Sequence, residues 1–243
     1  MQEAGDHMID AKNLTASELN TKIRESDADV IEIQNILGQR YIANASNGKK
    51  IKLFGTCGNN LGSFLDGSEI EVFGNVQDAC ANTMNDGKII LHGMCGDALG
   101  YGMRGGKIFV EKDCGSRCGI HMKATKTKQP LMIIGGVVQD FFGEYLSGGT
   151  LIVLNLQNEA SCCGRYCGCG AHGGSIILRL SDLSQACHLT SQLKKVDDKK
   201  KAYIDQALNE YANDLHITLP KTMDFYEVIM QNKNPYERLY VEN

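Results

Sequence analysis

The sequence predicts an all-β fold, a right-handed parallel β-helix of about seven to eight coils with a short N-terminal helix and a helical C-terminal tail. Apolar residues occur in pairs two positions apart, and between Ile51 and Ile108 the pairs begin again every 19 residues. Glycine is abundant, with 27 residues against 3 prolines, which is typical of short strands joined by tight turns. Within 87–124 one pattern occurs twice, an alternating strand followed by a glycine-rich turn and a methionine.

Residues 1–28 are expected to form an N-terminal cap that contains one short helix. Thr15 and Glu18 have the spacing of a capping box, in which each side chain accepts a hydrogen bond from the backbone of the other residue. Apolar residues follow at helical spacing, so a helix is predicted from about Ala16 to Glu25. We expect it to cover the exposed end of the repeats.

Residues 29–180 are predicted to form the repeats. Their inward-facing pairs are expected to be Ile31 and Ile33, Ile51 and Leu53, Ile70 and Val72, Ile89 and Leu91, Ile108 and Val110, Leu131 and Ile133, Leu151 and Val153, and Ile176 and Leu178. The last three intervals are 23, 20 and 25 residues. Extra residues at 126–129, near 137–138 and at 155–160 account for the difference, and such insertions usually become loops on one face.

Stacking is required because one repeat is not stable alone. It buries only a few aliphatic side chains, at roughly 1.5 to 3 kcal/mol each, whereas ordering its backbone costs about 1 to 2 kcal/mol per residue. Stacked coils pair their strands in parallel at about 4.8 Å and bury a continuous column of side chains. Glycine suits the corners, where the backbone needs a positive φ or a close approach between coils.

Residues 181–243 are predicted to form a helix-rich tail that packs on the repeats. An apolar stripe at helical spacing consists of Tyr203, Ile204, Ala207, Leu208, Tyr211 and Leu215. Pro220 ends this segment. A further short helix is predicted from Asp224 to Met230, before Pro235.

Composition limits the classes of function. The formal charge of −4 and the isoelectric point near 5.9 indicate no nucleic acid and no anionic membrane as partner. The N-terminus has no basic segment followed by an apolar one, and 18 consecutive apolar residues occur nowhere, so a soluble, cytoplasmic protein is expected. In that compartment the ten cysteines are expected to be free thiols.

A cysteine-rich segment is the strongest candidate for a metal site. Its candidate ligands for zinc or an iron–sulfur cluster are Cys162, Cys163, Cys167, Cys169 and His172. The repeat register favours buried packing instead, because cysteine alternates with valine or leucine at two repeat positions. These positions are Cys57, Val76, Cys95, Cys114 and Cys163, and Leu61, Cys80, Leu99, Cys118 and Cys167.

Cys162, Cys169 and Cys187 fall outside this scheme. A disulfide between Cys95 and Cys114 on adjacent coils is sterically feasible, but a cytoplasmic location argues against it.

No catalytic or cofactor-binding residue is predicted. Met84, Met103 and Met122 recur at one repeat position and are expected in the core. The histidines His92, His121 and His172 lie next to turns, have no acidic partner at a telling spacing, and are expected at corners or on the surface. Gly100–Gly105 matches GxGxxG, but the glycines recur in neighbouring repeats and no βαβ unit follows, which argues against a dinucleotide site.

Several segments resemble the GXGXG domain at the C-terminal end of the large subunit of glutamate synthase. They read YGMRGGKIFVEKDCGSRCGIHMKA, IIGGVVQDFFGEYLSGGTLIVL and CGCGAHGGSIIL within the repeats, IDAKNLTASELNTKIR near the N-terminus and FYEVIMQNKNPYERL in the tail. The resemblance covers nearly the whole chain. The G-D-x-x-G-x-x-M-x-G-G cadence is more distantly similar to the C subunit of formylmethanofuran dehydrogenase. The cadence departs from this pattern at 76–81, where glycines are replaced, and at Ala171, where a methionine is expected.

This resemblance implies a noncatalytic structural subunit of a glutamate synthase-type complex, which forms glutamate from 2-oxoglutarate and glutamine-derived ammonia. The chain would brace a separate amidotransferase subunit and an FMN-containing synthase subunit. FMN and an iron–sulfur cluster are expected in the partner, and none is expected to be bound by this chain. A homo-oligomer is also compatible with the sequence.

Two alternatives remain. The chain could be an interaction scaffold of another oxidoreductase or amidotransferase, such as a formylmethanofuran dehydrogenase-like complex. It could also be an independent enzyme that uses a groove of the repeats, although no acid/base pair or nucleophile stands out in the sequence.

Overall fold

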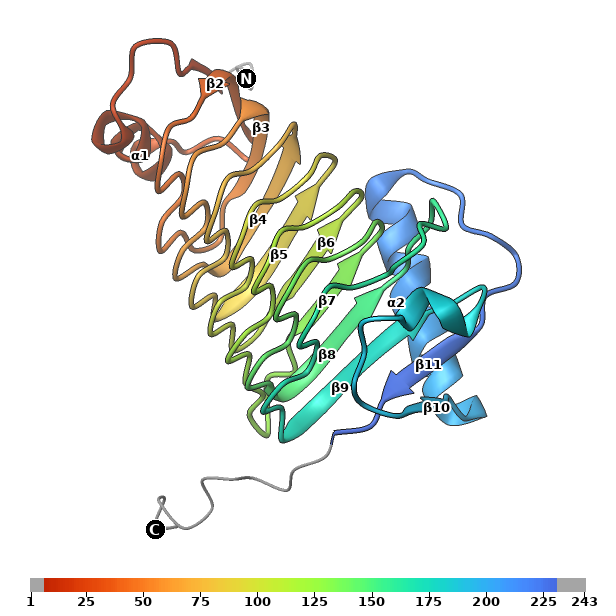
Figure 1. Ribbon diagram of the computed structural model, residues 1–243. Helices are drawn as coiled ribbons and strands as arrows, with labels where there is room; N and C mark the ends of the chain where they lie inside the picture. Colours follow the sequence, from red (N-terminus) through yellow and green to blue (C-terminus); the bar gives the residue numbers. More distant parts are fainter. Residues whose placement is uncertain (1–6, 231–243) are drawn as a thin grey trace, which may run out of the picture.

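The computed structural model describes residues 7–230, which form one open sheet of 11 strands with two α-helices (Figure 1). The strands are β1 (His7–Asp10), β2 (Ile31–Leu37), β3 (Lys50–Thr56), β4 (Asp66–Phe73), β5 (Asp86–Leu91), β6 (Lys107–Val110), β7 (Leu131–Ile134), β8 (Ser147–Val153), β9 (Gly173–Arg179), β10 (Leu193–Lys195) and β11 (Phe225–Val228). The helices are α1 (Ala16–Glu25), the short 3₁₀ helix η1 (Leu183–Ala186) and α2 (Asp198–Leu215). Strands β1 to β9 pair in parallel in chain order, and β11 and β10 follow in antiparallel orientation.

The predicted all-β class and the parallel β-helix are therefore wrong. The described residues form a single mixed, mostly parallel sheet that does not close, and its helices make the protein α/β. The repeats do stack, but each repeat adds only one strand, on one side. Opposite this sheet, neighbouring repeats meet at isolated bridges such as Cys95 with Cys114. Tight turns there leave no room for further strands.

Each repeat, here called a coil, forms these turns with left-handed residues at alternate positions. In the coil that contains Ala98, Gly100 and Gly102 the three φ angles are 58°, 65° and 61°. The N–H groups of Ala98 and Gly102 donate to carbonyls of the following coil, at 2.8 and 2.9 Å, while the Gly100 N–H donates to the preceding coil at 2.8 Å. The same alternation recurs from coil to coil and links each one to both neighbours on the side away from the sheet.

The core lies between the sheet and these turns, where the predicted inward pairs and both cysteine positions are buried in most coils. Strand β7 differs from the prediction. Its inward residues are Met132 and Ile134, which pair with Ile108 and Val110 of β6. Leu131 and Ile133 face outward into the second apolar cluster, beneath α2. The regular interval of 19 residues is consequently kept between β7 and β8, and no extra residue occurs near 137–138.

The N-terminal helix is confirmed, with the predicted bounds and the predicted capping box. The Glu18 N–H donates to Thr15 Oγ1 at 3.3 Å, and the Thr15 N–H donates to Glu18 Oε2 at 2.8 Å. Leu19 and Ile23 are buried and belong to the same core cluster as the first repeats. This helix therefore packs at the N-terminal end of the stack, as Figure 1 shows.

Helix α2 lies across the outer face of the later strands (Figure 1). The predicted stripe is buried against this face, except for Tyr203, which is 45% exposed. Tyr211 is fully buried, and its hydroxyl donates to the Val110 carbonyl at 2.9 Å. The predicted helix at 224–230 is wrong: β11 lies there, because it completes the sheet by pairing with β9. Pro235 lies outside the described residues.

Within residues 7–230, no helix is both long enough and apolar enough to cross a bilayer.

Two glycine substitutions distinguish the two reasons for glycine in the coils, which are a lack of space for a Cβ and a left-handed backbone. At Gly115 a Cβ would overlap Asp97 Oδ1, which accepts the Ser116 N–H at 2.8 Å, so Gly115→Ala is expected to destabilise by about 2 to 4 kcal/mol. At Gly102 φ is 61° but a Cβ would meet nothing closer than Thr83 Oγ1 at 3.8 Å, so Gly102→Ala is expected to cost only the left-handed conformation, about 1 to 2 kcal/mol. Chemical denaturation measures both, and equal midpoints for the two variants would contradict this ranking.

The hydrogen bond of Tyr211 can be tested within α2. Tyr211→Phe keeps the packed ring but leaves the Val110 carbonyl without its partner, so we expect a loss of about 1 to 2 kcal/mol in the free energy of unfolding. Tyr203→Phe on the same helix is the matched control, because its side chain is exposed and no change is expected. A loss no larger than that of the control would show that the hydroxyl does not hold the helix on the sheet.

Candidate functional site

The cysteine-rich segment lies in the last coil, where the Cys163 thiol contacts the thiols of Cys162 and Cys167. Cys162, Cys163 and Cys167 are buried in the core, whereas Cys169 is exposed. The ring of His172 is half-buried and places Nδ1 3.2 Å from the Gly170 carbonyl oxygen. Within residues 7–230, no group of three or more His, Cys, Asp or Glu side chains is arranged so that it could hold a metal ion.

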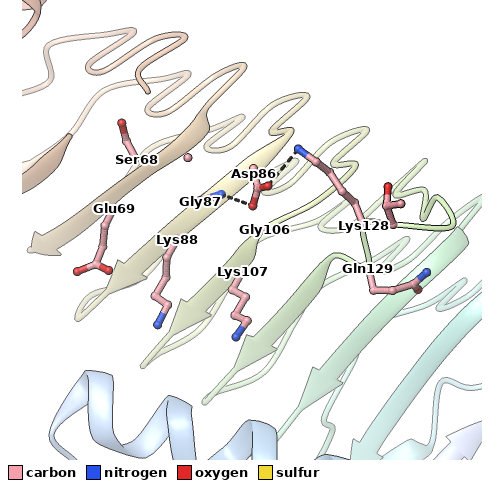
Figure 2. Close-up of a pocket in the computed structure, with 11 residues that line it drawn as sticks. Ser68, Glu69, Asp86, Gly87, Lys88, Gly106, Lys107, Lys128 and Gln129 are labelled. Atoms are coloured by element: carbon pink, nitrogen blue, oxygen red, sulfur yellow. Dashed lines mark hydrogen bonds and ion pairs between the residues drawn. The ribbon is translucent and has the colours of Figure 1, made fainter. Parts of the chain in front are cut away.

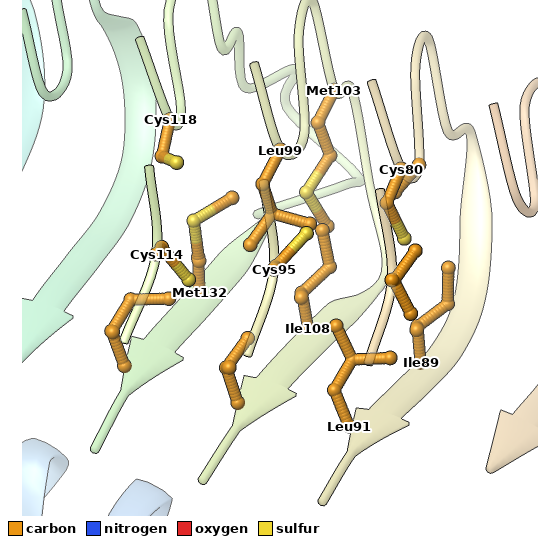
Figure 3. Close-up of a cluster of buried hydrophobic side chains, with 14 of the residues drawn as sticks. Cys80, Ile89, Leu91, Cys95, Leu99, Met103, Ile108, Cys114, Cys118 and Met132 are labelled. Carbon is orange, nitrogen blue, oxygen red and sulfur yellow. The ribbon is translucent and has the colours of Figure 1, made fainter. Parts of the chain in front are cut away.

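The interior thiols form part of the packed core (Figure 3). The bridges from Cys57 through Val76, Cys95, Cys114 and Val138 to Cys163 confirm that cysteine and valine share one repeat position. All ten cysteines are free, so Cys95 and Cys114 form no disulfide. Burial raises the pKa of the Cys57 thiol and, with the neighbouring Cys118 thiol, that of Cys114. Neutral, enclosed thiols such as these are poor nucleophiles and poor metal ligands. At Cys163 the contacting Cys162 and Cys167 thiols act in the opposite direction and lower the pKa, although the side chain is buried.

An acid–histidine cluster that the sequence did not predict lies on the outer face of the sheet. His92 Nε2 lies 3.0 Å from Glu71 Oε1, and His92 Nδ1 lies 3.4 Å from Glu111 Oε2. The ring also stacks on Phe73, with centroids 4.7 Å apart. The expectation that His92 has no acidic partner is therefore wrong. Because both ring nitrogens are engaged, the imidazole links neighbouring coils and has no free nitrogen for a substrate.

Two lysines point outward from β5 and β6 beside a cavity of about 370 Å³. Lys88 Nζ lies 2.7 Å from Asp214 and 2.8 Å from Glu210, and Lys107 Nζ lies 2.6 Å from Glu210. Partial burial acts to lower the pKa of Lys88, but the Asp214 and Glu210 carboxylates hold it above its usual range. These lysines thus pair with α2 and hold the helix at the amino ends of the central strands β5 and β6.

The other side of this cavity is closed by the 123–130 loop (Figure 2). Lys128 Nζ lies 3.1 Å from Asp86 Oδ2 and 3.0 Å from the Asn85 carbonyl oxygen. The Gly87 N–H, which donates at 2.8 Å, and Lys128 together hold the pKa of Asp86 below its usual range. With its lysines paired to carboxylates, this cavity has no unpaired cation to attract a phosphate.

A second cavity, of about 500 Å³, lies where the parallel strands β6, β7 and β8 end. The segment that follows α2 forms one wall, and the charged turn Glu111–Asp113 forms another. Unlike the lysines of the first cavity, Lys112 makes no ion pair with any residue in the described part of the chain. This cavity therefore has a lysine on its wall that no carboxylate of the described residues neutralises.

Comparison with known proteins identifies a family and a relative. The family model described as "GXGXG motif" matches residues 6–233. An uncharacterized protein of Methanocaldococcus jannaschii is 42% identical over 214 residues, which is 82% of this chain and 82% of that protein. The family match extends through the whole stack of coils, and the similarity to the relative covers most of the chain rather than one local motif.

Thiol reactivity tests the burial of the cysteines. In the native protein only the exposed Cys169 and Cys187 should react rapidly with a thiol reagent, and the other eight should react at the rate of unfolding. Labelling followed by peptide mass spectrometry measures this, with a Cys169→Ser/Cys187→Ser double variant as the unreactive control. Rapid native labelling of Cys163 or Cys167 would contradict the buried assignment.

Proposed function

The chain belongs to the GXGXG motif family, the type found as the C-terminal domain of the glutamate synthase alpha subunit, and from this we propose that it is a noncatalytic structural subunit of a glutamate synthase-type complex. In that complex glutamate would be formed from 2-oxoglutarate and ammonia released from glutamine. An amidotransferase subunit would release the ammonia, and an FMN-containing subunit would use it. The present chain would brace the two.

The observation that carries this proposal is the extent of the family match, which spans residues 6–233 and therefore all the coils. The side chains in this region that could carry chemistry are mostly committed to the stack. Interior thiols are buried, His92 uses both nitrogens, and Lys88 and Lys107 are paired with α2. Such a chain is better suited to hold partners in place than to act on a substrate.

The cofactors of the reaction are assigned to the partner subunits. An iron–sulfur cluster needs several cysteine thiolates directed at one point. The described cysteines instead point into a packed core or, at Cys169 and Cys187, lie singly on the surface. We therefore place FMN and the cluster in the synthase subunit.

Two surfaces are available for bracing. The outer face of β2 to β4 lies outside the apolar cluster beneath α2, which begins at Ile90 in β5. On the turn side, aromatic rings of adjacent coils form a row: His121 lies 5.8 Å from Tyr101 and 5.1 Å from Tyr145 between ring centroids. Aromatic side chains displayed on a rigid frame are typical of protein interfaces. We propose that the two partners bind to these two faces.

Reconstitution tests the function. We expect the chain to co-purify with the separately encoded amidotransferase and FMN-containing subunits of its own source, and to raise glutamine-dependent glutamate formation by at least about tenfold, because it holds the two active sites together. Glutamate formation from added ammonium salt should change much less, since free ammonia needs no passage between subunits. This second rate is the internal control.

Failure of the three chains to associate under native conditions would overturn the proposal. Equal stimulation by glutamine and ammonium would also contradict a bracing role, because it would place the effect on the synthase subunit alone. Stable association with the subunits of another oxidoreductase, such as a formylmethanofuran dehydrogenase-like assembly, would assign the chain to that complex instead.

A further inference from the structure

The cavity at the carboxyl ends of β6, β7 and β8 has the features of a small-molecule site. Its volume is about 500 Å³, within the range of ligand pockets. Leu156, Ile217 and Pro220 supply an apolar wall, and Leu156 and Ile217 pack against the cluster beneath α2. The consecutive residues Glu111, Lys112 and Asp113 supply charge on the facing wall. An apolar wall with a few converging polar groups is typical of a site for an organic ligand.

Lys112 breaks the pattern of the repeat at this cavity. Two residues before the bridged position, the coils on either side carry Gly55, Gly74, Gly93 and Gly136, and the last coil carries Ser161. At Gly74 and Gly93 a Cβ would overlap the carbonyl oxygen of the preceding coil, which explains the glycine. In this one coil a long cationic side chain replaces it and lines the cavity. Close packing does not account for this lysine, so the cavity itself is its best explanation.

The charges of the cavity are only partly used. The Lys112 side chain is exposed and makes no hydrogen bond or ion pair with the described residues. Glu111 approaches His92 through Oε2, at 3.4 Å, and Asp113 accepts the Val137 N–H through Oδ1, at 2.8 Å. Each carboxylate therefore has its other oxygen available. One unpaired cation lies between two partly available anions.

We propose that this cavity binds a free α-amino acid, with the ligand carboxylate paired to Lys112 and the ligand ammonium group paired to Glu111 and Asp113. A simple anion would meet both carboxylates, and a simple amine would meet Lys112, so a ligand with one charge leaves part of the site unsatisfied. A zwitterion satisfies both signs, and its side chain can lie against Leu156 and Ile217. This site is independent of the bracing role proposed above.

Binding is coupled to the docking of α2. Ile217, Thr218 and Pro220 line the cavity and directly follow this helix. Tyr211 fixes the helix to the Val110 carbonyl, at the residue before Glu111. A ligand that contacts both walls binds only the docked arrangement and must therefore stabilise it. The free amino acid is then expected to slow amide hydrogen exchange at 211–219.

The test uses the full chain and a panel of L-glutamate, L-glutamine, L-alanine and glycine, with 2-oxoglutarate and n-butylamine as ligands that lack one of the charges. Calorimetric titration and the thermal midpoint should show binding of at least one amino acid, and at least about tenfold weaker binding of both single-charge ligands. Lys112→Ala and Lys112→Gly, which restores the glycine of the repeat, should weaken amino-acid binding by at least about tenfold. Lys123→Ala, at another exposed lysine, should leave it unchanged.

Three results would overturn the assignment. These are the absence of binding by every amino acid in the panel at millimolar concentrations, equal binding of 2-oxoglutarate, and full binding by both Lys112 variants. Each Lys112 variant is first compared with the unmodified chain by its unfolding midpoint. It should be unchanged for Lys112→Ala, because the side chain has no described partner, and slightly lower for Lys112→Gly, because glycine gains more backbone freedom on unfolding. If the ligand slows hydrogen exchange only at residues outside 211–219, it binds elsewhere, and this result would also contradict the proposed site.

Discussion

The hydrogen-bond ladder on the turn side is the interaction on which the stack depends. A buried backbone must pair its polar groups, and turns usually fail to do so without help from side chains or water. Here the left-handed residues of each coil direct their N–H groups alternately to the following and the preceding coil, as in Ala98, Gly100 and Gly102. Every coil is thereby tied to both neighbours opposite the sheet. The sheet imposes the same register on the opposite side of each coil. Equivalent residues of successive coils therefore stack directly on one another and form a column. The apolar core, the cysteine positions and the methionine positions are such columns.

This ladder also explains which glycines the fold requires. Ala79, Ala81 and Thr83 take φ angles of 57°, 59° and 53°, so the coil that has lost its glycines keeps the same turn. The left-handed conformation costs an ordinary residue about 1 to 2 kcal/mol, which a ladder with many bonds can offset. Glycine is needed more strictly where the neighbouring coil occupies the space of a Cβ. At Gly87 a Cβ would lie 2.2 Å from the Ser68 carbonyl oxygen of the preceding coil, and there both requirements coincide, because φ is 103°. The glycine pattern of the sequence is thus explained by backbone geometry, without a catalytic role for the glycines.

Periodicity predicted the N-terminal helix and most inward-facing columns, because these depend on local capping and on a fixed interval between coils. It failed at β7, where Leu131, Met132, Ile133 and Ile134 are all apolar and all buried. A strand covered on both faces shows no alternation, so the pattern could not choose between the two registers. The outer cover comes from α2, which begins more than sixty residues later in the chain. Strand β11 was also not predicted, because it is a strand only through its pairing with β9, which is distant in the sequence. The fold class was predicted wrongly for a related reason. A β-helix has several strands in each repeat, but here the turn residues adopt left-handed backbone at alternate positions and form no strand.

For the candidate sites too, the repeat predicts which residues are buried but not which side chains of different coils contact each other. The cysteines are candidate metal ligands by residue type, but they occupy the same repeat positions as valine and leucine and are buried there. His92 appeared isolated in the sequence, yet Glu71 and Glu111 reach it from the neighbouring coils once the strands are in register. A repeat protein contains its own internal comparison, because each column shows what the stack alone demands at that position. A residue that fits its column needs no further explanation. Lys112, where the coils on both sides carry Gly93 and Gly136, does not fit its column. Packing cannot account for the side chain at such a departure, so binding is the more economical explanation.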